Sequence, residues 1–209
     1  MMTTMNVRHE KQVIITGFGG QEVITAGDIL GRAASAYDHK FVAMMQTYGP
    51  EVWGSCCSVR IIIGKNEILF PYLRETNVLV CMSQDGYSRN IGCLQRGGTL
   101  IWDADLVEIK DTDPSWATGH IPATRLALEL GERSAAAVAM LGFLAVVSDL
   151  VRVESLREAV LAHAPVAPKE IAAAAFERGW QYGKVVSKRR TKEERIYNVG
   201  RYEILEKTF

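Results

Sequence analysis

The sequence has few of the residues that usually carry chemistry. Its 209 residues include four histidines and four cysteines. The histidines are scattered, and none has a spacing typical of metal ligands (His9, His39, His120 and His163). His120 follows Gly119 in an irregular stretch, which is more typical of a hydrogen-bonded loop residue than of a site. No Gly-x-Ser-x-Gly nucleophile elbow is present. We therefore expect no catalytic set and no metal site on this chain.

The cysteines also lack a recognisable pattern. No pair among Cys56, Cys57, Cys81 and Cys93 has the spacing of a zinc ribbon or an iron–sulfur cluster. The adjacent pair Cys56-Cys57 would form a strained disulfide. Reduced, buried thiols in a cytoplasmic protein are the favoured interpretation.

Net charge and long apolar runs are missing as well. Lys plus Arg equals Asp plus Glu at 24 each, so no overall field attracts nucleic acid or a membrane surface. The most apolar window, residues 134–147, is too short to span a bilayer and is interrupted by Gly142. The N-terminus has no apolar core of a secretory signal. We expect a cytoplasmic protein with neither a nucleic-acid nor a membrane partner.

What is present is a regular succession of strand and helix patterns. Apolar, β-branched runs predict strands over 12–16, 41–45, 57–63 and 78–82, a strand from Thr99 to Trp102, and one more short strand over 106–109. Helical spacing predicts helices over 22–36, 84–95, 135–150, 153–163 and 168–182, and residues 103–122 form a loop-rich stretch. This order predicts an α/β fold: an open, mostly parallel sheet flanked by helices, with a helical C-terminal part and an extended tail.

The C-terminal part suggests a boundary near residue 183. Residues 184–192 are basic and are balanced by Glu193 and Glu194. They lack the interleaved aromatic residues of a single-strand nucleic-acid binder. The following tail is rich in apolar residues that have little chain left to bury them. We expect one domain over 1–183 and a basic, apolar arm over 184–209 that docks on a partner subunit.

The most informative stretch is Gly17-Phe18-Gly19-Gly20-Gln21, which follows an apolar run and precedes a helix pattern. A glycine-rich turn in this position lets the main chain approach an anion or a partner closely. As a dinucleotide signature it is weak, because Glu22 would repel a pyrophosphate and Gln46-Thr47 stand where an acidic residue is expected. A tight packing turn is the stronger interpretation.

A second stretch, Tyr48-Gly49-Pro50-Glu51, follows the next predicted strand. Together, the two stretches resemble the gamma subunit, or gamma domain, of the 2-oxoacid:acceptor oxidoreductases, whose pattern is Gly-x-Gly-Gly-Gln-Gly followed by Tyr-Gly-Pro-Glu-x-Arg-Gly-Gly. The resemblance covers about residues 11–182. It marks Gly17, Gly19, Gly20 and Gln21, and with them Tyr48, Gly49, Pro50 and Glu51, as residues of loops near coenzyme A and the active site.

The resemblance implies an oxidoreductase subunit without a cofactor of its own. Such complexes, common in anaerobic metabolism, use thiamine diphosphate, Mg and 4Fe-4S clusters held by alpha, beta and delta-type subunits. They oxidise a 2-oxo acid with coenzyme A and pass electrons to ferredoxin or to a subunit that reduces NAD. The gamma part is expected to pack against these partners and to help cover the reaction centre.

The sequence departs from the family pattern at four positions. Glu22 and Ser55 replace glycines, Trp53 replaces the arginine, and Ser134 stands where an asparagine is usual. Tryptophan in place of arginine removes a fixed cation and adds a flat apolar surface, which would suit an aryl 2-oxo acid such as phenylglyoxylate. Two alternatives stay open: a free-standing nucleotide-binding module or small dehydrogenase, and a scaffold whose Tyr48 loop touches no ligand.

Overall fold

The computed structural model describes residues 10–49, 55–69, 72, 74–163 and 167–206. Six strands form one sheet in the order β2-β3-β1-β4-β5-β6. Their bounds are β1 Lys11–Phe18, β2 Phe41–Thr47, β3 Cys56–Gly64, β4 Thr76–Cys81, β5 Leu94–Asp103 and β6 Ala117–Ile121. The central strands β1, β3 and β4 are apolar and rich in β-branched residues, as expected for strands covered on both faces.

The sheet is mixed, with one reversed strand. β4 pairs in parallel with β1 and β5, and β5 with β6, whereas β3 is antiparallel to both β1 and β2. β2 therefore runs in the direction of β1, and all strands except β3 point the same way. This confirms the expected open, mostly parallel sheet. Because of this direction, the carboxyl ends of β1 and β2 meet at one edge of the sheet.

Four predictions from the sequence are wrong, all of them between residues 84 and 122. The helix expected over 84–95 is α2 (Gln84–Asn90) plus a 3₁₀ turn, and β5 already begins at Leu94. The Gly97-Gly98 pair lies inside β5, where Gly97 has φ 73° and the register with β4 shifts. Because glycine is typical of both turns and bulges, the strand predicted to begin at Thr99 is placed too late along the chain. Residues 106–109 form no strand, and the expected loop over 103–122 contains β6 and is followed by α3 (Ala123–Leu128).

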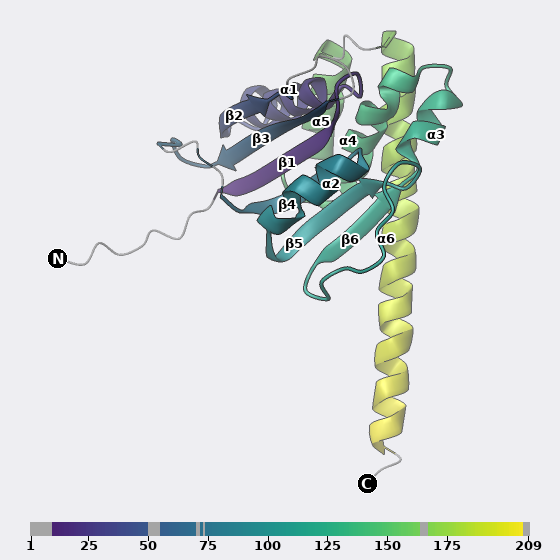
Figure 1. Cartoon of the computed structure of the whole chain (residues 1–209). Helices are drawn as coiled ribbons and strands as arrows, with labels where there is room; N and C mark the ends of the chain where they lie inside the picture. Colours follow the sequence, from purple (N-terminus) through teal and green to yellow (C-terminus); the bar gives the residue numbers. More distant parts are fainter. Residues whose placement is uncertain (1–9, 50–54, 70–71, 73, 164–166, 207–209) are drawn as a thin grey trace, which may run out of the picture.

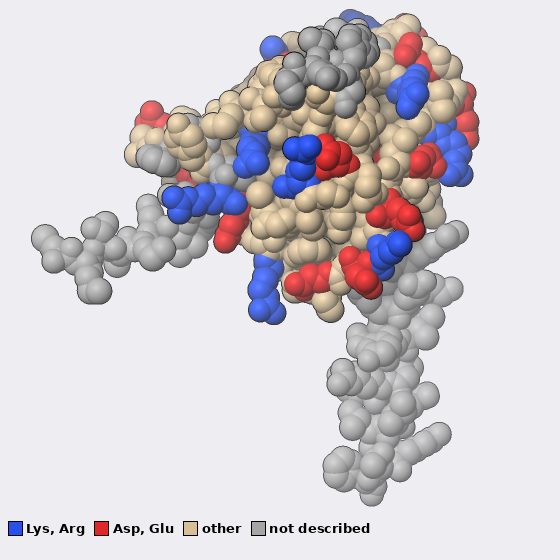
Figure 2. Space-filling model, viewed as in Figure 1, with Lys and Arg blue, Asp and Glu red and all other residues tan. Residues whose placement is uncertain are grey.

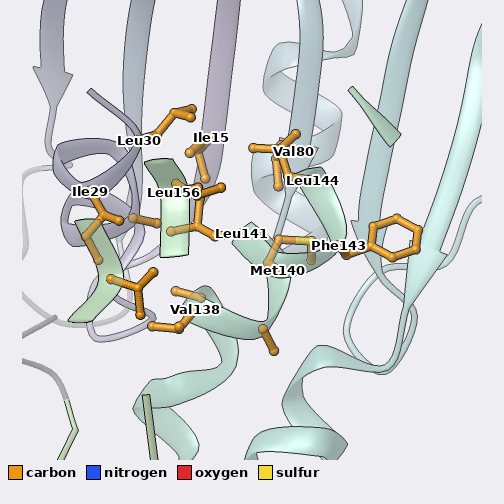
Figure 3. Close-up of a cluster of buried hydrophobic side chains, with 14 of the residues drawn as sticks. Ile15, Ile29, Leu30, Val80, Val138, Met140, Leu141, Phe143, Leu144 and Leu156 are labelled. Carbon is orange, nitrogen blue, oxygen red and sulfur yellow. The ribbon is translucent and has the colours of Figure 1, made fainter. Parts of the chain in front are cut away.

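Helices cover the two faces of the sheet unequally. α1 (Val23–Arg32), α4 (Ala136–Val147), α5 (Val153–His163) and the first part of α6 (Lys169–Glu206) lie on one side, and α2 lies across the other (Figure 1). Figure 3 shows the larger core, where Ile15 and Val80 of the sheet meet Leu30 of α1 and Leu144 of α4. The smaller core on the other face includes Ile14, Leu79 and Leu100 under α2 and the 104–116 loop.

The contact between α4 and α6 depends on glycine. A Cβ added at Gly179 would lie 1.9 Å from the main-chain oxygen of Ala139, and one at Gly142 would lie 2.1 Å from that of Phe176. No side chain fits at such distances, so the two helices touch through their backbones. The small alanine side chains of both helices are compatible with this close approach.

α5 is anchored at its first turn by a buried carboxylate. Asp38, whose side chain is 3% exposed, accepts hydrogen bonds from the Arg152 main-chain N–H (3.0 Å) and guanidinium Nε (2.8 Å). The Ser155 hydroxyl donates to the same carboxylate. Burial alone would raise the pKa of Asp38, but the hydrogen bonds from Ser155 and Arg152, with the charge of Lys40, lower it below its ordinary value.

α6 continues as one helix through the position where the sequence suggests a boundary. It runs from Lys169 to Glu206, and its yellow half projects beyond the sheet in Figure 1. Trp180 contacts two cations, with the Arg157 guanidinium 5.4 Å and the Lys184 ammonium 4.1 Å from its ring centre. The Arg157 contact links α5 to α6 just before the arm, whereas Lys184 lies on α6 itself. Docking of the arm on a partner stays a prediction.

The described surface carries the mixture of charges expected from equal numbers of basic and acidic residues. In Figure 2, basic and acidic side chains are interspersed over the visible described surface, without a broad area of one sign. Within the described ranges, no helix is both long enough and apolar enough to cross a membrane.

Candidate functional site

The first glycine-rich stretch forms the turn from β1 to α1 at the carboxyl edge of the sheet. Gly20 has φ 90°, and Glu22 has φ 56° and ψ 28°, both in the left-handed region. The Gly19 N–H donates to the main-chain oxygen of Ser55 (3.1 Å), so the turn is bonded to the segment that begins β3. The position where the family pattern has its final glycine is thus a left-handed one, which explains the preference for glycine there.

Gln21 holds this turn with its side chain. Its Oε1 accepts a hydrogen bond from the Phe18 N–H (2.6 Å), and its Nε2 donates to the main-chain oxygen of Met82 (2.8 Å). The Met82 N–H in turn donates to the oxygen of Thr16 (2.8 Å). One amide side chain therefore joins the ends of β1 and β4, which requires both a donor and an acceptor on the same group.

Gly17 makes room for this arrangement. A Cβ at position 17 would lie 2.6 Å from the Gln21 Oε1, 2.8 Å from Val23 and 3.2 Å from Met82. Glycine is required here for close packing of the turn, and its main chain needs no positive φ. The packing interpretation of the motif is thus supported at Gly17 and Gln21.

The second stretch lies beside the first. Tyr48 is 65% exposed, and its hydroxyl donates to the Gln46 side chain (2.6 Å). A Cβ at Gly49 would lie 2.3 Å from Cβ of Ser55, so the two ends of the intervening loop meet closely. Pro50, Glu51 and Trp53 lie outside the described residues.

The two stretches share one cavity of about 520 Å³. Its described lining is mainly apolar and combines both motifs with the start of α1 and of β3 (Phe18, Gly19, Gly20, Glu22, Val23, Ile24, Tyr48, Gly49, Ser55 and Cys57). Of the predicted site residues, Gly19, Gly20, Tyr48 and Gly49 line the cavity. Gly17 and Gln21 are not among its lining residues but stabilise the turn that forms part of it. Phe18, Val23, Ile24 and Cys57 were not predicted, because an apolar lining residue looks like a core residue in sequence.

The described lining residues provide one carboxylate and one thiol. Glu22 accepts a hydrogen bond from the Thr25 hydroxyl (2.8 Å). Burial raises the pKa of the Cys57 thiol, and Cys56 and Glu22 add to the rise, so this thiol is protonated at neutral pH. Neither Lys nor Arg is among the described lining residues. The described part of the lining is therefore mainly apolar, and it supplies no side-chain cation to a phosphate group.

Of the residues considered for metals or catalysis, Cys57 lines this cavity, whereas His120 and Cys81 do not. Among the described residues, no group of three or more His, Cys, Asp or Glu is placed to hold a metal ion. His120 is on β6, not in a loop, and its exposed ring lies 5.2 Å from that of Trp102. Cys81 is buried under α2, and burial raises the pKa of its thiol.

Solved structures place the fold in one class. The chain is similar to the gamma subunit of a keto/oxoacid ferredoxin oxidoreductase from Geobacter sulfurreducens, with a TM-score of 0.73 and 28% identity over 84% of this chain and 99% of that one. It also matches part of the 2-oxoglutarate:ferredoxin oxidoreductase from Magnetococcus marinus, with a TM-score of 0.73 and 17% identity over 87% of this chain and 31% of that one. The fold is that of a gamma-type oxidoreductase subunit.

The sequence comparisons agree and are more specific. The family model for pyruvate ferredoxin/flavodoxin oxidoreductase matches residues 12–182. The 2-oxoglutarate synthase subunit KorC of Methanocaldococcus jannaschii is 35% identical over 88% of this chain and 99% of its own length. The ketoisovalerate oxidoreductase subunit VorA of Methanothermobacter marburgensis is 32% identical over 64% of this chain and 27% of its own length. The chain belongs to the pyruvate ferredoxin/flavodoxin oxidoreductase family.

Proposed function

We propose that this chain is the gamma subunit of a multisubunit 2-oxoacid:ferredoxin oxidoreductase, located in the cytoplasm, whose motif loops face the catalytic subunits. The observation that carries the proposal is that two motifs separated by a helix and a strand form one wall of a single cavity at the carboxyl edge of the sheet. Ligands of open α/β sheets bind at that edge. The cavity accommodates an apolar group, such as the uncharged arm of coenzyme A or a partner side chain.

The assembled enzyme would carry out oxidative decarboxylation. A 2-oxo acid and coenzyme A would give an acyl-coenzyme A and carbon dioxide, with two electrons passed to two oxidised ferredoxins and one proton released. Thiamine diphosphate, bound by partner subunits, supplies the decarboxylation chemistry. This chain would orient its partners and exclude water through the turn at Gly17–Gln21 and the Tyr48-Gly49 segment.

For the substrate, 2-oxoglutarate is the better supported candidate. The KorC proteins of Methanocaldococcus jannaschii and Methanothermobacter thermautotrophicus are 35% and 37% identical to this chain over 88% and 81% of it. Trp53, in place of the family arginine, favours an aryl 2-oxo acid as the second candidate.

The test is to co-express the chain with subunits encoded beside its gene and to purify the complex. Turnover is then measured with 2-oxoglutarate, pyruvate, ketoisovalerate and phenylglyoxylate, each with ferredoxin and with NAD. The highest kcat/KM for 2-oxoglutarate with ferredoxin is expected, whereas preference for phenylglyoxylate would support the aryl alternative. If the isolated chain binds NAD or a flavin tightly, the free-standing nucleotide-binding function replaces this proposal.

A further inference from the structure

The outer edge of β2 differs from ordinary sheet edges. β2 ends the sheet on one side, and its seven residues, Phe-Val-Ala-Met-Met-Gln-Thr, include no charge and no proline. Natural proteins usually protect an edge strand with lysine, proline, a bulge or very short length, because its free main-chain groups can pair with another strand. None of these devices occurs within β2. Lys40, just before it, is engaged with Asp38 and the Leu150 main-chain oxygen.

Both faces of β2 carry apolar side chains up to this edge. Met44 lies opposite Ile61 of β3, which belongs to the larger core, so it faces the helix layer. Phe41 and Ala43 alternate with it and face the other side, where Ala43 packs against the smaller core. Phe41 is 49% exposed and Met44 39%. A strand that is apolar on both faces is typical of the interior of a sheet.

Exposed apolar side chains are concentrated around this edge. Of seven large hydrophobic side chains exposed within the described residues, three lie on β2 or directly after it (Phe41, Met44 and Tyr48), and Leu69 follows the end of β3 that pairs with Phe41; the others are Tyr72, Leu128 and Val185. The stretch that carries Leu69 lies beside Gly64, which pairs with Phe41. At the other end, β2 leads into Tyr48 and Gly49 of the cavity. The apolar edge and the candidate site are thus continuous.

We propose that β2 is a docking edge, to which an extended, uncharged segment of another subunit of the same oxidoreductase adds as a further strand. This inference rests on the proposed function. The relatives indicate which occupant this is: the matched region makes up 27% of VorA, and the matched fold makes up 31% of the Magnetococcus chain. The same unit is therefore built into longer chains, next to other parts of such enzymes. Main-chain pairing would give affinity, and apolar residues on alternate faces would give specificity.

Hydrogen exchange tests the pairing directly. In the isolated chain, every second amide of β2 faces the open edge and should exchange rapidly, while the amides of β1 and β4 are protected. In the assembled complex, the exchange of the β2 amides should slow at least tenfold. Assembly with unchanged exchange in β2 would overturn the inference.

A pair of lysine substitutions gives an independent test. Met44→Lys places a charge at the centre of the edge, whereas Leu128→Lys places one at a residue that is 56% exposed on α3. Met44→Lys should weaken association with the partner subunits at least tenfold, and Leu128→Lys should change it less than twofold. Equal effects of the two substitutions would contradict the inference. The melting temperature of each isolated variant, compared with wild type, separates loss of docking from loss of folding.

The remaining outcomes also decide between explanations. If the wild-type chain joins no complex, both the proposed function and this inference are wrong. If it assembles while β2 stays open, this inference fails alone. If light scattering shows that the isolated chain dimerises and that Met44→Lys abolishes the dimer, a second copy is the occupant and the partner-subunit inference is overturned.

Discussion

Two regions of this molecule are built with glycine, and they use it in different ways. At the α4–α6 contact, Gly142 and Gly179 remove side chains so that two helices touch through their backbones. At the β1–α1 turn, Gly20 supplies a positive φ, and Gly17 leaves space for the side chain of Gln21. The first use stabilises the fold, and the second shapes the cavity. The glycines that form a recognisable sequence motif are therefore not the ones that contribute most to the stability of the fold.

The largest effect should come from the helix contact. Gly179→Ala places a methyl group 1.9 Å from the Ala139 main-chain oxygen, so α4 and α6 must separate. We expect a loss of about 3 kcal/mol or more in the free energy of unfolding, and a fall in Tm on the order of 10 °C. Gly92→Ala is the matched control, because nothing lies within 4 Å of its added Cβ. Equal stability of both variants would refute the backbone contact.

The next effect should come from the turn. Gln21→Ala leaves the Phe18 N–H and the Met82 oxygen without their side-chain partner. The expected cost is about 2 kcal/mol, measured by denaturant unfolding. Gln21→Glu keeps an acceptor for Phe18 but cannot donate to Met82, so it should recover only part of this loss. Full stability of Gln21→Glu would show that the bond to Met82 contributes nothing.

The anchor of α5 predicts a pH dependence outside both glycine regions. Because Ser155 and Arg152 outweigh burial, the pKa of Asp38 is lower in the folded than in the unfolded state. Its contribution is present above the unfolded pKa, near 3.8, and is lost as pH falls through the folded pKa. Asp38→Asn should cost about 1.5 kcal/mol at neutral pH and reduce the acid dependence of stability. The measurement is the free energy of unfolding of wild type and Asp38→Asn from pH 7 to pH 2. An equal loss of stability with falling pH in the two proteins would contradict the prediction.

The smallest effect should be a gain. Glu22 holds a left-handed conformation that costs a non-glycine residue about 1 kcal/mol, partly offset by its bond to Thr25. Glu22→Gly should stabilise the chain by about 0.5 kcal/mol, whereas Glu22→Ala keeps the strain and should destabilise it. Calorimetry of the two variants decides the point through the opposite signs.

The sequence allowed much of the fold to be predicted, because buried strands and amphipathic helices leave clear patterns. The runs at 12–16 and 57–63 lie within β1 and β3. β6 was missed because its sequence, Ala-Thr-Gly-His-Ile, is short and has little apolar pattern. The reversed direction of β3 depends on tertiary pairing, which no local pattern records.

The candidate site was predictable only in part. Its two motifs could be recognised, and the structure brings the described residues of both to one cavity. The roles within it could not be assigned, since the bonds from Gln21 to Phe18 and Met82 join positions up to 61 residues apart. Pro50 and Glu51 lie outside the described residues, so their part in the site stays a prediction.

The uninterrupted course of α6 has a geometric consequence. A helix of 38 residues is about 57 Å long. The first part of α6 is held against α4 by direct backbone contact at Gly179. The distance and direction of the C-terminal end of α6 relative to the sheet are therefore fixed. Each residue inserted or deleted beyond Lys188 would move that end by about 1.5 Å and rotate it by about 100°. The length of α6 would therefore determine the position of any partner that binds at its C-terminal end.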